Sequence, residues 1–378
     1  MATANSLPLT NIVTISVVPP PAGLSAYNVN NLAIFTKETP VSGTLGDFTV
    51  YKDPTQVGTD WGLSSETYAA ALNVFAQTPN ILDGGGSLIV CAMGVNDTIS
   101  TMWTKISPQI FFGGALLVGY QADKTEMENG ASVFEANRRL LFLTSNDTEE
   151  LTAGYAFYDV QGASQRYVRC LLYTVSAAAA RLFAAAYAGR GMATDWDGSG
   201  TASTQQLKDL SNVDPDPGIT QTVLTLCETI GVDVYANFGT LPKLFSTGGN
   251  TFFDQVWGEL WLVYALQVAA VNALAQTPTK IPQTEEGVAY FRNAVTAVMQ
   301  RGVVNGFLAP GEWNGAAPFG LPATFKQSIR NLGFYVYSLP VAAQSQTARA
   351  ARQAPAIQAA GKTAGAIHSA GIVVNIEP

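Results

Sequence analysis

Few residues of this chain could take part in acid–base, nucleophilic or metal chemistry, and they lie far apart. The 378 residues include one histidine, His368. A histidine can transfer protons or bind a metal, but either task needs partner side chains held beside it. His368 lies in a predicted strand near the carboxyl terminus, and no GxSxG, HExxH or P-loop sequence occurs in the chain. We therefore expect no catalytic residue and no cofactor.

Two short segments resemble ligand-binding loops, but each lacks a required feature. Asp195 to Gly200 (DWDGSG) resembles the start of a calcium loop, yet the twelfth position is Gln206, where a bidentate glutamate is needed. Gly84 to Gly86 precede a predicted strand, whereas a phosphate-binding loop follows a strand and opens a helix. Both segments are predicted to be turns, and no metal site is expected.

The composition is that of a densely packed, mildly acidic protein. Hydrophobic residues make up 47% of the chain and charged residues 13%, with a net charge of −8; about 25% charged residues is usual. So little charge suggests that much of the surface is buried against a partner. Nucleic acid is not expected as that partner, because the basic residues are scattered and the net sign is wrong for phosphate. The three cysteines, in separate apolar runs, are predicted to be buried free thiols; they are Cys91, Cys170 and Cys227.

Neither end of the chain nor its most apolar stretch predicts a membrane protein. The opening MATANSLPLT has no basic region followed by an apolar run, so no signal peptide is expected and synthesis in a cytoplasm follows. The apolar stretch Leu260 to Ala275 is interrupted by Gln267 and Asn272 and is shorter than the ~20 residues of a membrane span. We predict a buried core helix there and no membrane insertion.

Hydrophobic periodicity predicts strands that alternate with helices. The predicted strands cover residues 31–36, 48–51, 87–93, 110–120, 139–144, 167–174, 232–238, 243–247 and 333–339. The predicted helices cover residues 61–77, 125–137, 148–160, 176–187, 220–230, 253–276 and 284–304. This alternation predicts an α/β (α+β) fold with mixed sheets flanked by helices.

A break in periodicity at Asp214 to Gly218 (DPDPG) predicts a domain boundary. We expect an outer α/β domain over residues 23–213 and an inner domain over residues 214–354. Residues 1–22 and 355–378 are predicted to be extended amino- and carboxy-terminal arms.

Each arm contains a strand with no evident partner in the chain. Asn11 to Val18 alternates in a two-residue period and stops at three prolines, and Thr363 to Pro378 alternates in the same way. Unpaired strands are usually covered, and adding them to a neighbouring chain's sheet is one way to do so. The chain is therefore predicted to polymerise. The residues expected to pair between subunits are Ile12, Val13, Thr14, Ile15, Ser16, Val17, Ile367, Ile372, Val373, Val374, Asn375 and Ile376.

A basic segment precedes the second arm. Arg349 and Arg352 in SQTARAARQ are three residues apart, which places them on one face if the segment is helical. One interpretation is a solvated surface helix; the other is a contact face for an acidic partner.

Several passages together resemble the contractile tail-sheath family of tailed bacteriophages in its compact form. The likeness spans nearly the whole chain, is strongest from Gly231 onward, and is one of order and local sequence rather than of a catalytic signature. The passages are Asn11 to Val18, Asn31 to Lys37, Trp61 to Gln77, Gly231 to Phe238, Thr251 to Gln276, Lys280 to Gly287, Arg349 to Ala356 and Gly365 to Ser369.

The resemblance implies a structural subunit of the virion tail, assembled in the host cytoplasm. In that family, subunits surround an inner tube and the sheath collapses to drive the tube through the host envelope. The implied partners are copies of the chain in a helical or stacked-ring polymer of hexameric rings, the tail tube protein, and baseplate and tail terminator proteins. The arms would complete a sheet in neighbouring subunits, and Arg349 and Arg352 would face the tube.

Two other functions stay open at this point. A non-viral contractile injection apparatus uses the same kind of sheath, and the neighbouring genes would separate it from a phage. An α/β enzyme with an unrecognised site belongs to a different class, and monodisperse globules with a turnover would favour it.

Overall fold

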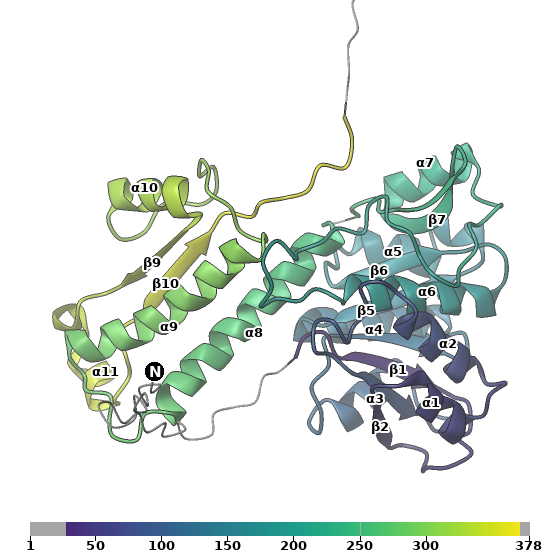
Figure 1. Ribbon diagram of the computed structural model, residues 1–378, viewed down its shortest axis with the longest axis horizontal. Helices are drawn as coiled ribbons and strands as arrows, with labels where there is room; N and C mark the ends of the chain where they lie inside the picture. Colours follow the sequence, from purple (N-terminus) through teal and green to yellow (C-terminus); the bar gives the residue numbers. More distant parts are fainter. Residues whose placement is uncertain (1–27, 250, 371–378) are drawn as a thin grey trace, which may run out of the picture.

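The computed structural model describes residues 28–249 and 251–370, and its largest element is an eight-stranded mixed sheet in the order β2-β3-β1-β4-β5-β6-β7-β8 (Figure 1). Its six inner strands are parallel, whereas β2 and β8 at the two edges run antiparallel to their neighbours. The predicted mixed α/β fold is confirmed. The strands are β1 Leu32–Thr36, β2 Phe48–Tyr51, β3 Leu88–Ala92, β4 Gly114–Val118, β5 Leu140–Ser145, β6 Val168–Leu172, β7 Val232–Phe238 and β8 Leu241–Phe245.

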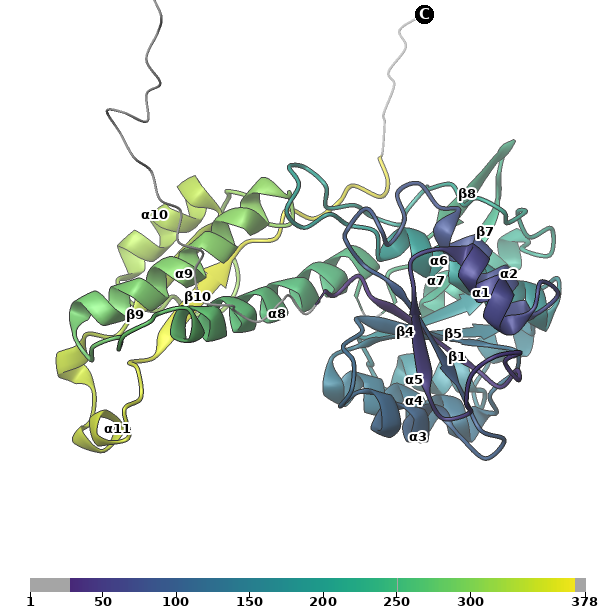
Figure 2. The same ribbon diagram turned by 60° about the horizontal axis from the view of Figure 1, so that its bottom comes forward.

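Helices cover both faces of this sheet (Figure 2). Strands β1 and β3 to β6 are buried along their whole length, as expected of parallel strands packed on both sides, and this explains their continuous apolar sequences. Each face of the sheet has its own cluster of buried hydrophobic side chains. One face carries α1 Pro54–Trp61, α2 Glu66–Phe75 and α6 Ala177–Gly191. The other carries α3 Ile99–Ile106, α4 Lys124–Asn137, α5 Ala156–Gly162 and α7 Gln221–Ile230, and a 3₁₀ turn covers Thr148–Leu151.

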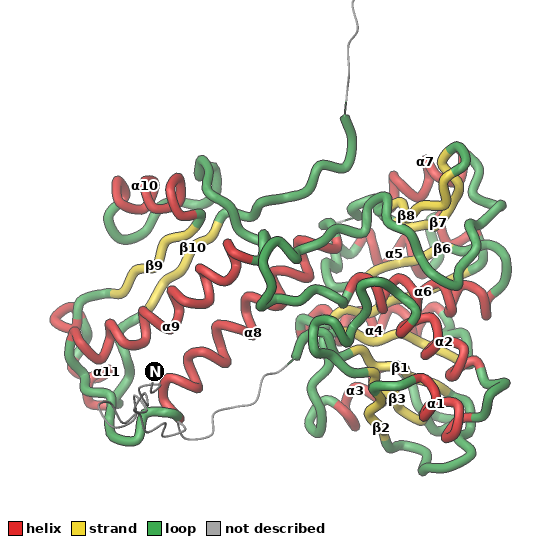
Figure 3. The backbone as a smooth tube through the Cα atoms, in the orientation of Figure 1, coloured by secondary structure: helices red, strands yellow, loops and turns green. Residues whose placement is uncertain are grey.

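A second region follows β8 and extends away from the sheet (Figures 1 and 3). Two long helices run beside each other and carry a small antiparallel pair of strands, β9 and β10. We call this region the carboxy-terminal domain. Its elements are α8 Phe253–Ala275, α9 Glu285–Val304, α10 Pro322–Leu332, β9 Phe334–Ser338, a 3₁₀ turn at Val341–Ala343, α11 Gln346–Ala350 and β10 Ile357–Gly361.

The boundary predicted at residue 214 falls inside the first domain, because β7 and β8 follow it and complete the large sheet. The segment that looked like a linker is fixed to the sheet instead. Asp216 accepts hydrogen bonds from the backbone N–H and the hydroxyl of Thr174, at 2.5 and 2.7 Å, and its own N–H donates to the carbonyl of Tyr235. The prolines and the glycine of this segment form part of the connection between α6 and α7. The large sheet ends with β8, and the carboxy-terminal domain begins with α8.

Several short elements were not predicted from the sequence. Helices α1, α3 and α10 have eight to eleven residues, which is too short for apolar periodicity to mark them clearly. Their capping residues were the available signal: Asp53 and Thr98 accept hydrogen bonds from the first turns of α1 and α3. Strand β10 has the sequence IQAAG, whose small residues have low β propensity.

Helix α8 is a core helix only in its first half. Phe253, Val256 and Trp257 are buried, and Trp261 stacks on Trp196 with ring centroids 4.8 Å apart. By length and composition alone α8 could cross a membrane, and 22% of its most apolar window is buried within the described structure. The prediction of a buried helix is therefore wrong for the second half, where Leu274 is 61% exposed.

Candidate functional site

The large sheet has the topology in which ligands usually bind, at the point where the strand order reverses. After β1 the chain forms β2 and β3, which lie on one side of β1, and it then forms β4 on the other side of β1. In doubly wound sheets, ligands occupy the crevice outside the carboxyl ends of the strands on either side of that reversal. Here the crevice lies beyond the carboxyl ends of β1 and β4.

Side chains of the protein itself fill this crevice. Glu38 accepts hydrogen bonds from the backbone N–H groups of Glu66 and Thr67, at 2.9 and 2.8 Å, and so occupies the anion position at the amino terminus of α2. Glu66 in turn accepts from the N–H of Gly119 at 3.1 Å and from both guanidinium donors of Arg181 at 2.5 and 2.7 Å. The arrangement stabilises the fold, and it occupies the N–H groups of Glu66, Thr67 and Gly119 that could otherwise bind a phosphate. No sequence motif marks it, because Glu38 and Arg181 belong to none.

We expect replacement of Arg181 by alanine to destabilise the first domain by about 3–5 kcal/mol, the usual cost of leaving a buried ionic partner uncompensated. The side chains of Arg181 and Glu66 are only 9% and 17% exposed. Urea unfolding of Arg181→Ala measures the loss. The matched control is Arg330→Ala, since Arg330 pairs with Glu312 at the surface with 62% and 67% exposure. Equal losses in the two variants would contradict a structural role for the buried pair.

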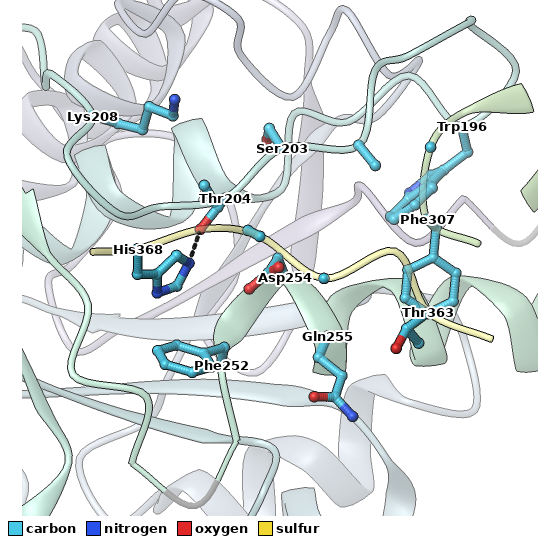
Figure 4. A pocket seen from close by; sticks show the side chains of 14 residues that line it. Trp196, Ser203, Thr204, Lys208, Phe252, Asp254, Gln255, Phe307, Thr363 and His368 are labelled. Carbon is cyan, nitrogen blue, oxygen red and sulfur yellow. Dashed lines mark hydrogen bonds between the residues drawn. The ribbon is translucent and has the colours of Figure 1, made fainter. Parts of the chain in front are cut away.

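His368 lies at a cavity and not in a strand, which corrects the prediction from sequence. The described residues 364–370 have no regular secondary structure, and the His368 ring contacts Phe252 edge-on at 4.4 Å between centroids. Its Nε2 shares a hydrogen bond of 3.0 Å with the hydroxyl of Thr204 (Figure 4). The cavity has a volume of about 380 Å³ and also contains Asp254, whose pKa is raised by burial.

This threonine, histidine and aspartate do not form a catalytic triad. A triad needs the base to be oriented by a hydrogen bond from its second nitrogen. Within residues 28–249 and 251–370, Nδ1 of His368 has no hydrogen-bond partner, although the atom is buried. The ring therefore serves as a contact between the carboxy-terminal segment and the loop at Thr204.

The two predicted turns and the three predicted buried thiols are confirmed. Asp195 to Gly200 and Gly84 to Gly86 are turns, and no group of three metal-binding side chains occurs within the described part of the chain. The three cysteines are buried free thiols, as predicted. Burial raises the pKa of Cys170 and of Cys227 to about 12, so these thiols stay protonated and unreactive at neutral pH.

The small sheet of the carboxy-terminal domain is covered on both faces. Tyr335 packs against Phe325 of α10, with ring centroids 5.3 Å apart. On the opposite face, Phe334 and Val336 join the cluster that includes Met299 of α9. The two faces of the β9–β10 sheet therefore have partners within the chain.

Within the described residues, neither outer edge of this sheet pairs with a third strand along β9 or β10, although residues 307–309 pair with Lys362 and Ala364 just beyond the end of β10. The N–H of Leu339 donates to Ala356, and that of Lys362 to Gly333, which fixes the alternation of hydrogen-bonded and non-hydrogen-bonded pairs. It follows that three residues of each strand direct their N–H and C=O groups away from the partner strand. Among the described residues, none of these outward groups takes part in a backbone hydrogen bond. They belong to Phe334, Val336, Ser338, Ile357, Ala359 and Gly361.

The predicted arm strands lie largely outside the described residues. Ile12 to Val17 and Ile372 to Ile376 are not described, so their predicted pairing stays a prediction. Ile367 is described and is 90% exposed. Just before it, the chain leaves β10 beside residues 307–309, where the N–H of Ala364 donates to the carbonyl of Phe307 at 2.9 Å.

Arg349 and Arg352 are exposed but do not share a helical face. Helix α11 ends at Ala350, and Arg352 has a left-handed backbone with φ of 56°. The two residues instead flank a turn that is held to the start of α9, where the amide of Gln283 donates to the carbonyls of Arg349 and Gln353. Neither arginine forms an ion pair with any residue that the structure describes.

Comparison with known proteins gives one family for the carboxy-terminal domain. Residues 253–376 match the family described as E217 tail sheath protein gp31-like, C-terminal domain. The match begins at the first residue of α8, where the architecture of the chain changes. No curated protein sequence matches the chain. The resemblance found in the sequence is confirmed over residues 253–376, which are similar to the carboxy-terminal domain of that tail sheath family.

Proposed function

We propose that the chain is the polymerising subunit of a contractile phage tail sheath, and that strand addition at the β9–β10 sheet joins its copies. One observation supports this above the others: a domain of the sheath family carries a two-stranded sheet with both edges open among the described residues. A strand edge without a partner presents N–H and C=O groups that can pair with a strand of another chain. Strands from neighbouring subunits would supply these partners.

The two arms are the proposed donors. Asn11 to Val18 and Ala364 to Glu377 would add to β9 and β10 of neighbouring subunits in stacked hexameric rings or helical strands. Contacts made through arms survive when bodies rotate, because the arm bends while its hydrogen bonds stay in place. This property suits a sheath that is assembled in an extended state and contracts to drive the tube through the host envelope for genome ejection.

The tail tube is the proposed partner of the basic turn at Arg349 and Arg352. Residues 253–378 contain eight lysines and arginines and six acidic residues, in a chain whose net charge is −8. The carboxy-terminal domain is therefore the more basic part, and it suits an acidic tube wall. Baseplate and tail terminator proteins would contact only the two ends of the polymer.

Replacing both arginines by glutamate should leave the sheath able to polymerise alone but impair its assembly around the tube. Each exposed ion pair is worth at most ~1 kcal/mol. The binding of the sheath to the tube is therefore the sum of many weak contacts along the polymer, and it can be released readily. Co-sedimentation with purified tubes, and imaging of tails from mutant virions, measure the effect. A control that combines Lys326→Glu on α10 with Arg292→Glu on α9, both exposed and in the same domain, matches the change in net charge. Tails that are extended, filled and normal in number in the double variant would show that the turn is merely solvated.

A further inference from the structure

The second half of α8 presents an apolar face that the described residues leave uncovered. Leu274 and Val271 are 61% and 42% exposed, and Tyr290 of the neighbouring α9 is 47% exposed. Val271 lines a hollow beside the α3–β4 loop and Tyr290 lines one between α8 and α9, and exposed apolar side chains that gather in this way often mark a contact.

Three hollows follow this face and join one another. Their volumes are about 280, 620 and 620 Å³. The middle one shares Tyr264 and Val268 with the hollow beside the α3–β4 loop, and it shares Ala269, Asn272 and Arg301 with the hollow between α8 and α9. Together they form one groove along α8, which we call the α8 groove.

The described chain begins at this groove. Asn28 lines the middle hollow and is fixed there, because its side-chain amide donates to the carbonyl of Gly84 at 3.0 Å and the next residue, Val29, is 3% exposed. The described chain therefore starts, at Asn28, at the edge of the groove.

We propose that Pro19 to Tyr27 (PPPAGLSAY) binds in the α8 groove of its own chain as an extended strap. The segment has no charged residue and contains three prolines, a leucine and a tyrosine. Proline-rich segments bind aromatic-lined grooves well, since they lose little conformational entropy on docking. Tyr264 and Tyr290 supply aromatic side chains along this groove.

The lengths agree with this assignment. From Tyr264 to Gln276 the helix rises about 18 Å at ~1.5 Å per residue. Nine extended residues span up to about 30 Å, which is enough to follow the groove from Asn28 to the end of α8. The strap would then hold the two domains together and fix the point from which the arm at Asn11 to Val18 departs. The inference is independent of polymerisation.

Disulfide trapping in the full-length chain tests the strap. Leu24→Cys is combined with Ala269→Cys in the groove, and the matched control combines Leu24→Cys with Leu82→Cys. Leu82 is 37% exposed, lies outside the groove lining, and is two residues from Gly84, which Asn28 contacts, so the tether to Asn28 favours neither pair. The three native cysteines are buried and do not compete. Under mild oxidation we expect an intrachain disulfide to form with Ala269→Cys about tenfold or more faster than in the control, because docking raises the effective concentration of the two thiols.

The outcomes separate the possible occupants of the groove. Equal rates in the two pairs would overturn the proposal. So would equally rapid disulfide formation in a mixture of the single variants Leu24→Cys and Ala269→Cys, because the segment of a second copy would then fill the groove. As a second measurement, deletion of residues 1–27 should raise the fluorescence of an apolar dye such as ANS severalfold over deletion of residues 1–18, which leaves the strap in place. Equal dye fluorescence in the two deletions also contradicts the strap.

Discussion

A chain that ends at Ala370 should fold normally and fail to polymerise. The deletion removes Gly371 to Pro378 and leaves the described contacts of Ala364 and His368 in place. If the deleted strand adds to a neighbour's sheet, each subunit loses several intersubunit hydrogen bonds, each worth about 0.5–1.5 kcal/mol net. A loss repeated at every contact abolishes the polymer rather than weakening it.

Circular dichroism and electron microscopy of the truncated chain measure this effect together. The melting temperature and the far-ultraviolet spectrum should match those of the full chain, while rings and tubes disappear. Val374→Thr is the matched control, because it retains a β-branched residue that suits a strand. Normal polymers from the truncated chain would show that this arm is dispensable.

Blocking the edges of the β9–β10 sheet, which are the proposed acceptors of the arm strands, should reduce polymerisation as strongly as deleting the arm. Ala359→Pro and Ser338→Pro each remove one outward N–H donor, and neither N–H is used in the β9–β10 pairing. Proline is tolerated in edge strands for this reason. The double variant should therefore keep its fold and lose strand addition at both edges.

The size of the polymer, measured by analytical ultracentrifugation, reports the result. Ala359→Val is the matched control, since it changes the same exposed position but keeps the donor. The double proline variant should sediment as single subunits, and the valine variant as polymers. Polymers of equal size from both variants would exclude these edges as the acceptor for the arms.

The sequence predicted the large sheet well because its strands are buried on both faces. Short continuous apolar runs such as Leu88–Ala92 and Leu140–Ser145 are typical of parallel strands that are buried on both faces, so the sequence marks them clearly. The domain boundary was misplaced because a Pro-rich segment resembles a linker whether or not it is fixed. Only the hydrogen bonds of Asp216 to Thr174 show that it belongs to the sheet.

The candidate site was less predictable, since its main features depend on contacts distant in sequence. Glu38 and Arg181 come together from positions far apart along the chain, and no local pattern marks them. The open edge of β10 escaped prediction, because its small residues do not resemble a strand. Arg349 and Arg352 were identified as an exposed basic pair, yet their three-residue spacing suggested a longer helix than α11. The arms were found from their two-residue period alone, and they remain predictions.

Negative-stain electron microscopy of the purified full-length chain, over a range of concentrations, tests the central claim most directly. The claim is that this protein works as a polymer whose subunits share strands. If it is correct, rings or tubes with a regular axial repeat form as the concentration rises, without any other protein. Monodisperse globules at every concentration would contradict it.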